Sequence, residues 1–187
     1  MYFDTIIAGF GGQGVLLMGN VLAYAAMHAG KQVTYMPVYG VEMRGGTANC
    51  TVVISDRPVG SPIIHEPVSA VVMNRPSAEK FGPMVKKKGQ VFVNASLIKE
   101  GQFTTRAKTV CWVPTMELAS DIGNRRLANM VMLGAVVQGG GMLTIQQVAD
   151  ALSGALDPRY HKMIPANVEA LKAGARFISE QKAAKKG

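Results

Sequence analysis

The start of the chain places a glycine-rich turn between a short apolar strand and a long apolar helix. Residues 2–8 read as a buried strand that is β-branched near its end. The turn GFGGQG follows at residues 9–14, and residues 15–29 form an apolar helical segment. A second strand is expected over residues 32–36, ending at Pro37. Strand, helix and strand in this order predict an α/β fold built on a parallel sheet.

The rest of the chain continues this alternation and then changes to helices. Further strands are expected over residues 48–54, 70–73, 90–94 and 109–113. Helices are expected over residues 115–122 and 125–138. Two more helices are expected to begin at Thr144, which fits a capping box, and near Pro165. We therefore expect a single Rossmann-like three-layer α/β domain over residues 1–187, with a mostly parallel sheet and a helical C-terminal third. Its ordered core is expected over about residues 3–180, with a basic tail over 181–187.

Composition argues against disorder, a membrane span and a cysteine framework. Apolar residues make up 48% of the chain and charged residues 17%, unlike a disordered chain. The longest weakly polar stretch, residues 127–143, is too short and too interrupted to span a bilayer. The N-terminus lacks the basic region of a secretory signal, so we expect a cytoplasmic protein. Cys50 and Cys111 form no Cys-x-x-Cys motif, which excludes a cysteine zinc site and a self-contained iron–sulfur cluster, and both thiols are expected in the core.

The basic surplus of the chain sits mostly at ends and turns. The formal net charge is +8, from 20 Lys and Arg against 12 Asp and Glu. Lys86, Lys87 and Lys88 are expected to end a helix, where the helix dipole favours cations. A nucleic-acid or anionic-surface binder is one interpretation of this charge. We disfavour it because the basic residues do not interleave with aromatic residues, which make up only 6% of the chain.

The helix over residues 15–29 is apolar almost all the way round. Its polar side chains Asn20, Tyr24 and His28 recur every four residues and form one narrow stripe. A helix that covers one face of a sheet needs an apolar stripe of little more than about 100°. One interpretation is a deeply buried central helix. We favour the other, that its outer face packs against another polypeptide, because a domain of this size rarely encloses a helix on nearly every side.

The glycine-rich turn carries the spacing of a nucleotide-binding fingerprint. Gly9, Gly11 and Gly14 match G-x-G-x-x-G between a strand and a helix. An NAD(P) site is disfavoured, because the second strand ends without the acidic residue that holds the ribose hydroxyls. Gly12 and Gln13 suit a loop that lies flat against a partner or a phosphate-bearing ligand at the helix N-terminus. A plain structural turn is the third interpretation.

A second glycine-rich loop, YGVEMRGG at residues 39–46, follows the second strand. The carboxyl end of a strand is where ligands bind in open α/β sheets. Glu42 and Arg44 either pair with each other or reach outward, Arg44 to a phosphate or carboxylate and Glu42 to a donor. The sequence therefore leaves open whether this loop is braced internally or takes part in binding.

Three motifs resemble those of one family. GFGGQGV at residues 9–15, YGVEMRGG at 39–46 and NMVMLG at 129–134 are similar to motifs of the gamma subunit (gamma domain) of the 2-oxoacid:ferredoxin oxidoreductases. The resemblance covers about residues 3–180 and is greatest to the 2-oxoglutarate:ferredoxin oxidoreductase branch. Family members often carry Ser and Pro where Val38 and Val41 stand here, so the rigidity of the second loop differs.

The resemblance implies a role inside a larger oxidoreductase. Such enzymes convert a 2-oxoacid, here expected to be 2-oxoglutarate, and CoA to an acyl-CoA and CO2, or run in reverse. The complex uses thiamine diphosphate, Mg2+ and [4Fe–4S] clusters and passes the electrons to ferredoxin. Its gamma subunit holds no cofactor or metal alone, contributes no catalytic residue, and assembles with alpha and beta catalytic subunits, with or without a ferredoxin-like delta subunit. By analogy, the residues facing those subunits or CoA are Gly11, Gly12, Gln13, Gly14, Tyr39, Glu42, Arg44, Gly45 and Gly46.

The residues of the chain are consistent with this implication. No Gly-Asp-Gly followed by Asn-Asn suggests a thiamine diphosphate site, and no Ser/His/Asp set or carboxylate pair stands at a suggestive spacing. The isolated chain is therefore expected to be inactive. Asn129, polar within an apolar helix, is expected to satisfy buried backbone groups. The alternatives are a stand-alone dinucleotide-binding oxidoreductase and a beta-type subunit of an indolepyruvate oxidoreductase, which shares the same domain type.

Overall fold

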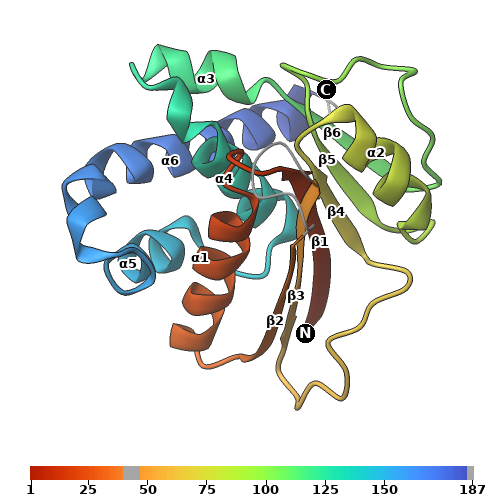
Figure 1. Cartoon of the computed structure of the whole chain (residues 1–187), viewed down its shortest axis with the longest axis horizontal. Helices are drawn as coiled ribbons and strands as arrows, with labels where there is room; N and C mark the ends of the chain where they lie inside the picture. Colours follow the sequence, from red (N-terminus) through yellow and green to blue (C-terminus); the bar gives the residue numbers. More distant parts are fainter. Residues whose placement is uncertain (40–46, 185–187) are drawn as a thin grey trace.

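A six-stranded mixed sheet forms the centre of the molecule, with helices on both of its faces (Figure 1). The structure, a computed structural model, describes residues 1–39 and 47–184. Strands β1 to β6 span Tyr2–Phe10, Gln32–Tyr39, Thr47–Ser55, Ser69–Val72, Gln90–Asn94 and Thr109–Val113. Helices α1 to α6 span Val15–His28, Arg75–Phe81, Thr115–Asp121, Ala128–Gly140, Ile145–Ala155 and Ile164–Ala184, and three short 3₁₀ helices span Gly82–Met84, Arg125–Leu127 and Pro158–Met163.

The strand order of the sheet is β2-β3-β1-β4-β5-β6. Strands β1, β4, β5 and β6 pair in parallel, whereas β3 runs antiparallel to both β1 and β2. Five of the six strands therefore share one direction, and the prediction of a mostly parallel sheet is confirmed. The β1–α1–β2 unit does not place its two strands side by side, because β3 is inserted between them.

The two faces of the sheet are covered unequally. Along β1, Ile7 points into the core beneath α1 and the C-terminal helices, whereas Ile6 and Ala8 point into a smaller core on the opposite face. That smaller core is completed by α2 and the segment between β5 and β6 (Figure 1). The expected three layers and helical C-terminal third are thus confirmed. No helix within residues 1–39 and 47–184 is both long and apolar enough to cross a membrane.

Helix α1 is enclosed mostly by its own chain. The Asn20 amide donates a hydrogen bond to the Ala155 carbonyl of α5 at 3.3 Å. The Tyr24 ring lies so close to Gly154 that a Cβ there would come within 2.3 Å of the Tyr24 hydroxyl oxygen. Asn20 and Tyr24 therefore face α5, whereas His28 at the end of the stripe is exposed. Packing within the chain accounts for most of the apolar composition of α1, but Leu17 is 36% and Met27 58% exposed. That the outer face of α1 packs against another polypeptide stays a prediction.

Strand β2 continues through Pro37 to Tyr39, so its predicted end at Pro37 is wrong. Because β2 is an edge strand, it pairs on one side only, with β3. A proline has no N–H to donate, and an edge strand tolerates this because half of its backbone groups face away from the sheet. The extension carries β2 to the end of the sheet where the glycine-rich turn begins, since Tyr39 pairs with Ala48 and Ala48 with Gly9.

The sequence predicts a helix that ends at residues 86–88 but not the bounds of α2. Its cap is Asn74, whose side-chain oxygen accepts a hydrogen bond from the Ser77 N–H at 2.9 Å, and Pro76 lies in its first turn. The expected helix end at residues 86–88 is wrong. Those lysines form a turn before β5, because the chain leaves its helical conformation at Met84.

Candidate functional site

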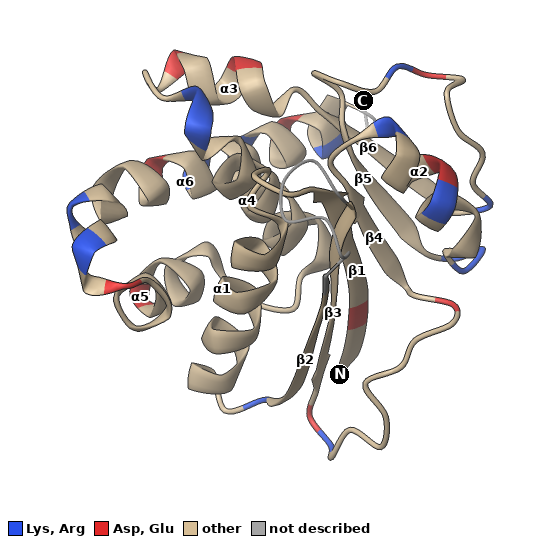
Figure 2. Cartoon of the chain, in the orientation of Figure 1, with Lys and Arg blue, Asp and Glu red and all other residues tan. Residues whose placement is uncertain are grey.

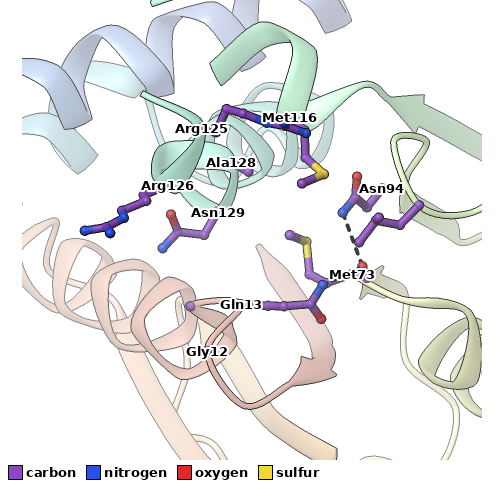
Figure 3. A pocket seen from close by; sticks show the side chains of 11 residues that line it. Gly12, Gln13, Met73, Asn94, Met116, Arg125, Arg126, Ala128 and Asn129 are labelled. Carbon is purple, nitrogen blue, oxygen red and sulfur yellow. Dashed lines mark hydrogen bonds between the residues drawn. The ribbon is translucent and has the colours of Figure 1, made fainter. Parts of the chain in front are cut away.

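A cavity of about 260 Å³ lies at the carboxyl ends of β1, β4 and β5 (Figure 3). This is the edge of an open α/β sheet where ligands bind. The glycine-rich turn after β1 contributes one wall, and the first residue after β4 and the last residue of β5 contribute the next. The starts of α3 and α4 close the far side. The cavity is lined by Gly12, Gln13, Gly14, Met73, Asn94, Leu97, Met116, Arg125, Arg126, Ala128 and Asn129.

The Gln13 side chain fastens the glycine-rich turn to the next strand of the sheet. Its Oε1 accepts hydrogen bonds from the Phe10 N–H at 2.7 Å and from the Asn74 amide at 3.1 Å. Its Nε2 donates to the Met73 carbonyl at 3.1 Å. The amide is therefore engaged within the chain. Gln13 fixes the shape of the cavity wall rather than reaching toward a partner.

Asn94, at the end of β5, performs the same task on the other side of the cavity. Its Nδ2 donates to the Met73 carbonyl at 3.2 Å, and its Oδ1 accepts a hydrogen bond from the Thr115 hydroxyl at 2.7 Å. One carbonyl thus receives hydrogen bonds from both Gln13 and Asn94. The ends of three parallel strands are held in register around the cavity before any ligand binds.

The N-terminus of helix α1 at the cavity lacks a side-chain cap. Helix α1 begins after Gly14, which provides no side-chain hydrogen bond, and its first turn has no acidic residue. Helix α4 instead continues directly from the 3₁₀ helix at Arg125–Leu127, whose N-cap Asn124 accepts a hydrogen bond from the Arg126 N–H at 3.1 Å. Free N–H groups and the positive end of the helix dipole therefore remain available at the start of α1. Such an arrangement attracts an anion.

Arg125 and Arg126 add positive charge to the same cavity. Both are exposed and lie on the 3₁₀ helix that leads into α4. Neither guanidinium forms an ion pair with an acidic side chain in the described part of the chain. Arginine binds phosphate and carboxylate oxygens through two parallel N–H bonds. The cavity rim is therefore suited to a phosphate-bearing ligand.

Asn129 lies between the start of α4 and the glycine-rich turn (Figure 3). The residue is only 8% exposed, and its side chain forms no hydrogen bond with another described residue, contrary to the expectation that it satisfies buried backbone groups. Its amide packs on Gly14, where an added Cβ would lie 2.3 Å from Nδ2. Gly14 also has a φ of +71°, which a glycine adopts without strain. The close approach places an unengaged amide on the cavity wall.

A second, larger cavity of about 620 Å³ adjoins the first and shares Arg126 and Asn129 with it. Its walls are mostly apolar, with Leu17 from α1 and Leu156 from the end of α5 among them. Lys162 adds a cation to this wall, and Asp157 adds a carboxylate that forms an ion pair with Arg159. Together the two cavities suit a ligand with an anionic group and a larger organic body.

The described residues lining the first cavity include no carboxylate, histidine or cysteine. The nearby Glu117 forms a hydrogen bond with the Ser96 hydroxyl, and this bond, the backbone N–H of Glu117 and the charge of Arg125 hold the pKa of Glu117 below its ordinary value. Burial raises the pKa of the Cys50 thiol to about 12. No group of three His, Cys, Asp or Glu within residues 1–39 and 47–184 could hold a metal ion. The lining chemistry therefore suits binding rather than proton transfer.

The structure brings together part of the predicted site. Gly12, Gln13 and Gly14 line the cavity, and Gly11 belongs to the same turn. The Tyr39 backbone ends β2 at the same edge of the sheet. The predicted residues Glu42, Arg44, Gly45 and Gly46 lie outside the described residues.

Sequence analysis missed Met73, Asn94, Met116, Arg125 and Arg126 as cavity residues. Two local signals were present. An asparagine ends the β5 segment, and a pair of arginines stands directly before the α4 segment. Neither signal indicates a shared cavity without the strand order, because these residues are distant from residues 9–14 in the sequence.

Comparison with known proteins gives a consistent result. Residues 4–177 match the family described as pyruvate ferredoxin/flavodoxin oxidoreductase. The chain is 38% identical over 175 residues to the ketoisovalerate oxidoreductase subunit VorA of Methanothermobacter thermautotrophicus, covering 93% of this chain and 36% of VorA. The chain thus spans about a third of the length of that relative. It is 32% identical to the 2-oxoglutarate synthase subunit KorC of the same organism, covering 93% of this chain and 94% of KorC.

The fold is also found among solved structures. The 2-oxoglutarate:ferredoxin oxidoreductase of Magnetococcus marinus, solved with 2-oxoglutarate, coenzyme A and succinyl-CoA bound, superposes with a TM-score of 0.85 at 19% identity. The match covers 96% of this chain and 31% of that one. At this identity the likeness concerns the fold, and it confirms the α/β architecture.

Proposed function

The chain belongs to the pyruvate ferredoxin/flavodoxin oxidoreductase family, and from this premise we propose that it is the gamma component of a 2-oxoacid:ferredoxin oxidoreductase. The complex would oxidise a 2-oxoacid with CoA to an acyl-CoA and CO2 and reduce ferredoxin. The observation that carries this proposal is the pair of cavities at the carboxyl end of the sheet. They combine anion-attracting groups with an apolar wall, and the only carboxylate among their described lining residues, that of Asp157, forms an ion pair with Arg159.

In this proposal the cavities bind CoA. The uncapped start of α1, with Arg125 and Arg126, would hold phosphate oxygens. The Asn129 amide would donate to or accept from the ligand, and the larger apolar cavity would take an organic part of the molecule. CoA supplies the thiol that accepts the acyl group, and the residues of this chain bind and orient it. The presence of coenzyme A in the M. marinus relative supports the choice of ligand.

The remaining cofactors are assigned to partner chains. The described residues offer no donor set for a metal ion, and the two cysteines, Cys50 and Cys111, cannot supply the four thiolates that a [4Fe–4S] cluster needs. We therefore assign thiamine diphosphate, Mg2+ and the [4Fe–4S] clusters to alpha and beta subunits, with or without a delta subunit. The site residues Gly11 to Gly14 and Tyr39 to Gly46 are proposed to face these subunits or CoA.

The substrate is proposed to be 2-oxoglutarate, as the sequence predicts, with a branched-chain 2-oxoacid as the second candidate. The two candidates correspond to the names of the relatives KorC and VorA. Independent dinucleotide binding gains no support, because β2 reaches Tyr39 without presenting a carboxylate for the ribose.

Reconstitution tests the proposed function. The chain is produced with the alpha and beta chains of its host, and 2-oxoacid-dependent, CoA-dependent reduction of ferredoxin is measured with 2-oxoglutarate and with 2-oxoisovalerate. The proposal expects activity with one of them, loss of that activity when this chain is omitted, and none from the chain alone. Full activity without this chain, or NAD(P) reduction by the chain alone, would contradict it.

A further inference from the structure

Lysines gather at the amino end of the sheet, opposite the two cavities (Figure 2). The turn at residues 86–88 precedes β5, and Lys108 directly precedes β6. The Thr109 N–H donates to the Gly89 carbonyl at 3.3 Å, so these two stretches of chain are neighbours in space. We refer to Lys86, Lys87, Lys88 and Lys108 as the amino-end lysine cluster.

This part of the chain carries most of the net charge. Residues 75–108 contain eight Lys and Arg and two Asp and Glu, a net charge of +6 out of +8 for the whole chain. All four lysines of the cluster are exposed, and none forms an ion pair with an acidic side chain in the described ranges. The neighbouring Arg106 forms an ion pair with Glu66, so that carboxylate is already engaged. The cluster therefore projects an uncompensated positive field from one end of the molecule.

The residue types indicate what kind of partner fits this field. Lysine is depleted in permanent interfaces, which are more apolar, whereas exposed charges chiefly raise the rate at which an oppositely charged partner arrives. The turn at residues 86–89 and residues 106–108 contain no aromatic side chain on which a nucleic-acid base could stack. A reversibly bound protein with an acidic surface fits these properties better than a permanent subunit or a nucleic acid.

We infer that the amino-end lysine cluster is a docking surface for an acidic electron-carrier protein. The inference rests on the proposed function, in which the complex delivers electrons to such a carrier, and on the four exposed and unpaired lysines. The cluster brings the carrier to the complex and holds it by charge attraction, while electron transfer itself uses the clusters of the partner subunits. The ligand cavities and the carrier surface then lie at opposite ends of the same parallel strands, so both can be occupied at once.

The test uses the reconstituted complex and an acidic ferredoxin. The variant Lys87→Glu/Lys88→Glu reverses two charges of the cluster, and Lys172→Glu/Lys182→Glu makes the same change in charge on α6. We expect the KM for ferredoxin to rise roughly fivefold in the cluster variant at about 20 mM salt and less than about twofold at about 300 mM, since salt screens exposed charges. The control variant should change it less than about twofold at either salt concentration. Turnover with a small dye as electron acceptor should not change.

Three results would overturn the inference. The first is a KM for ferredoxin that changes no more in the cluster variant than in the control. The second is a rise that is equal at both salt concentrations. The third is a cluster variant that loses retention on a nucleic-acid column while its KM for ferredoxin stays unchanged. A wild-type complex that neither reduces ferredoxin nor oxidises a 2-oxoacid with the dye as acceptor would instead contradict the proposed function.

Discussion

The two ends of the sheet use positive charge in different ways. At the carboxyl end, Arg125 and Arg126 stand beside an asparagine and the start of α1, and hydrogen bonds from Gln13 and Asn94 fix the surrounding walls. At the amino end, the four lysines stand on exposed turns. The first arrangement is pre-organised and suits a small anion of defined shape. The second arrangement tolerates many binding geometries and suits a reversibly bound protein.

The largest expected effect comes from Gly14→Ala, which attacks the pre-organised end. The added Cβ would lie 2.3 Å from the Asn129 amide nitrogen, at a φ of +71°. We expect the free energy of unfolding to fall by about 3 kcal/mol, and CoA-dependent activity to be lost with it. Chemical denaturation and the KM for CoA measure the two effects.

Gly101→Ala provides the matched control for that substitution. Gly101 also has a positive φ, of +81°, but nothing lies within 4 Å of its added Cβ. It should lose only about 1 kcal/mol and keep its CoA kinetics. Equal losses for the two variants would show that backbone strain alone matters at Gly14 and that its contact with Asn129 does not.

Gln13→Ala removes the side chain that fastens the glycine-rich turn. The Phe10 N–H and the Asn74 amide lose their acceptor, so we expect the free energy of unfolding to fall by about 2 kcal/mol. The KM for CoA should rise as the turn loosens. Gln146→Ala, on the exposed face of α5, should cost less than about 0.5 kcal/mol. A Gln13 variant as stable as the Gln146 variant would show that the turn holds its shape without this side chain.

Arg126→Ala separates binding from stability at the same end. Its guanidinium is exposed and forms no ion pair among the described residues, so the free energy of unfolding should stay within about 0.5 kcal/mol of wild type. The KM for CoA should rise about tenfold, as expected for the loss of one charge-assisted phosphate contact. Arg176→Ala, on α6, should leave the KM unchanged. Equal KM values for CoA in the Arg126→Ala and Arg176→Ala complexes, measured by steady-state kinetics, would contradict the assignment of Arg126 to CoA binding.

The smallest expected effect concerns Asp56 at the amino end of the sheet, which forms ion pairs, unlike the amino-end lysine cluster. Hydrogen bonds from Lys31, at 2.6 Å, and from the N-terminal ammonium lower the pKa of Asp56 from 3.8 to about 2. Because the folded pKa lies below the unfolded one, the pairing stabilises the fold above about pH 4, and this contribution disappears as the pH falls toward 2. Asp56→Asn should therefore weaken the dependence of Tm on pH in this window, as thermal unfolding would show. A steeper or unchanged dependence would contradict the pairing.

The sequence predicted contiguous features better than assembled ones. The glycine-rich turn was identified because its residues are adjacent and their backbone chemistry is local. Asn94 and Arg126 were missed because only the strand order β1-β4-β5 brings them beside that turn. The predicted role of Asn129, hydrogen bonding to buried backbone groups, is not found among the described residues. Its amide instead packs in the space left by the missing Cβ of Gly14, which lies more than 100 residues away in the sequence. Pro37 was read as a strand end because its edge position is a property of the whole sheet.

The charge of the chain shows the same limitation. Along the sequence, the net charge of +8 indicates only that basic residues lie at ends and turns. In the folded chain, the turns before β5 and β6 meet, and this adjacency turns scattered lysines into a surface. The same holds for α1, since α5 returns to cover the side that carries Asn20, while the packing of a second polypeptide on the exposed Leu17 and Met27 stays a prediction.

The most direct test of the account is equilibrium binding of CoA to the assembled complex. Calorimetry would compare complexes that contain the wild-type chain and the Arg125→Ala/Arg126→Ala variant. We predict that the variant assembles normally and raises the Kd for CoA by about tenfold or more, with the KM for the 2-oxoacid unchanged. An unchanged Kd for CoA in a fully assembled variant complex would contradict the assignment of these cavities to CoA.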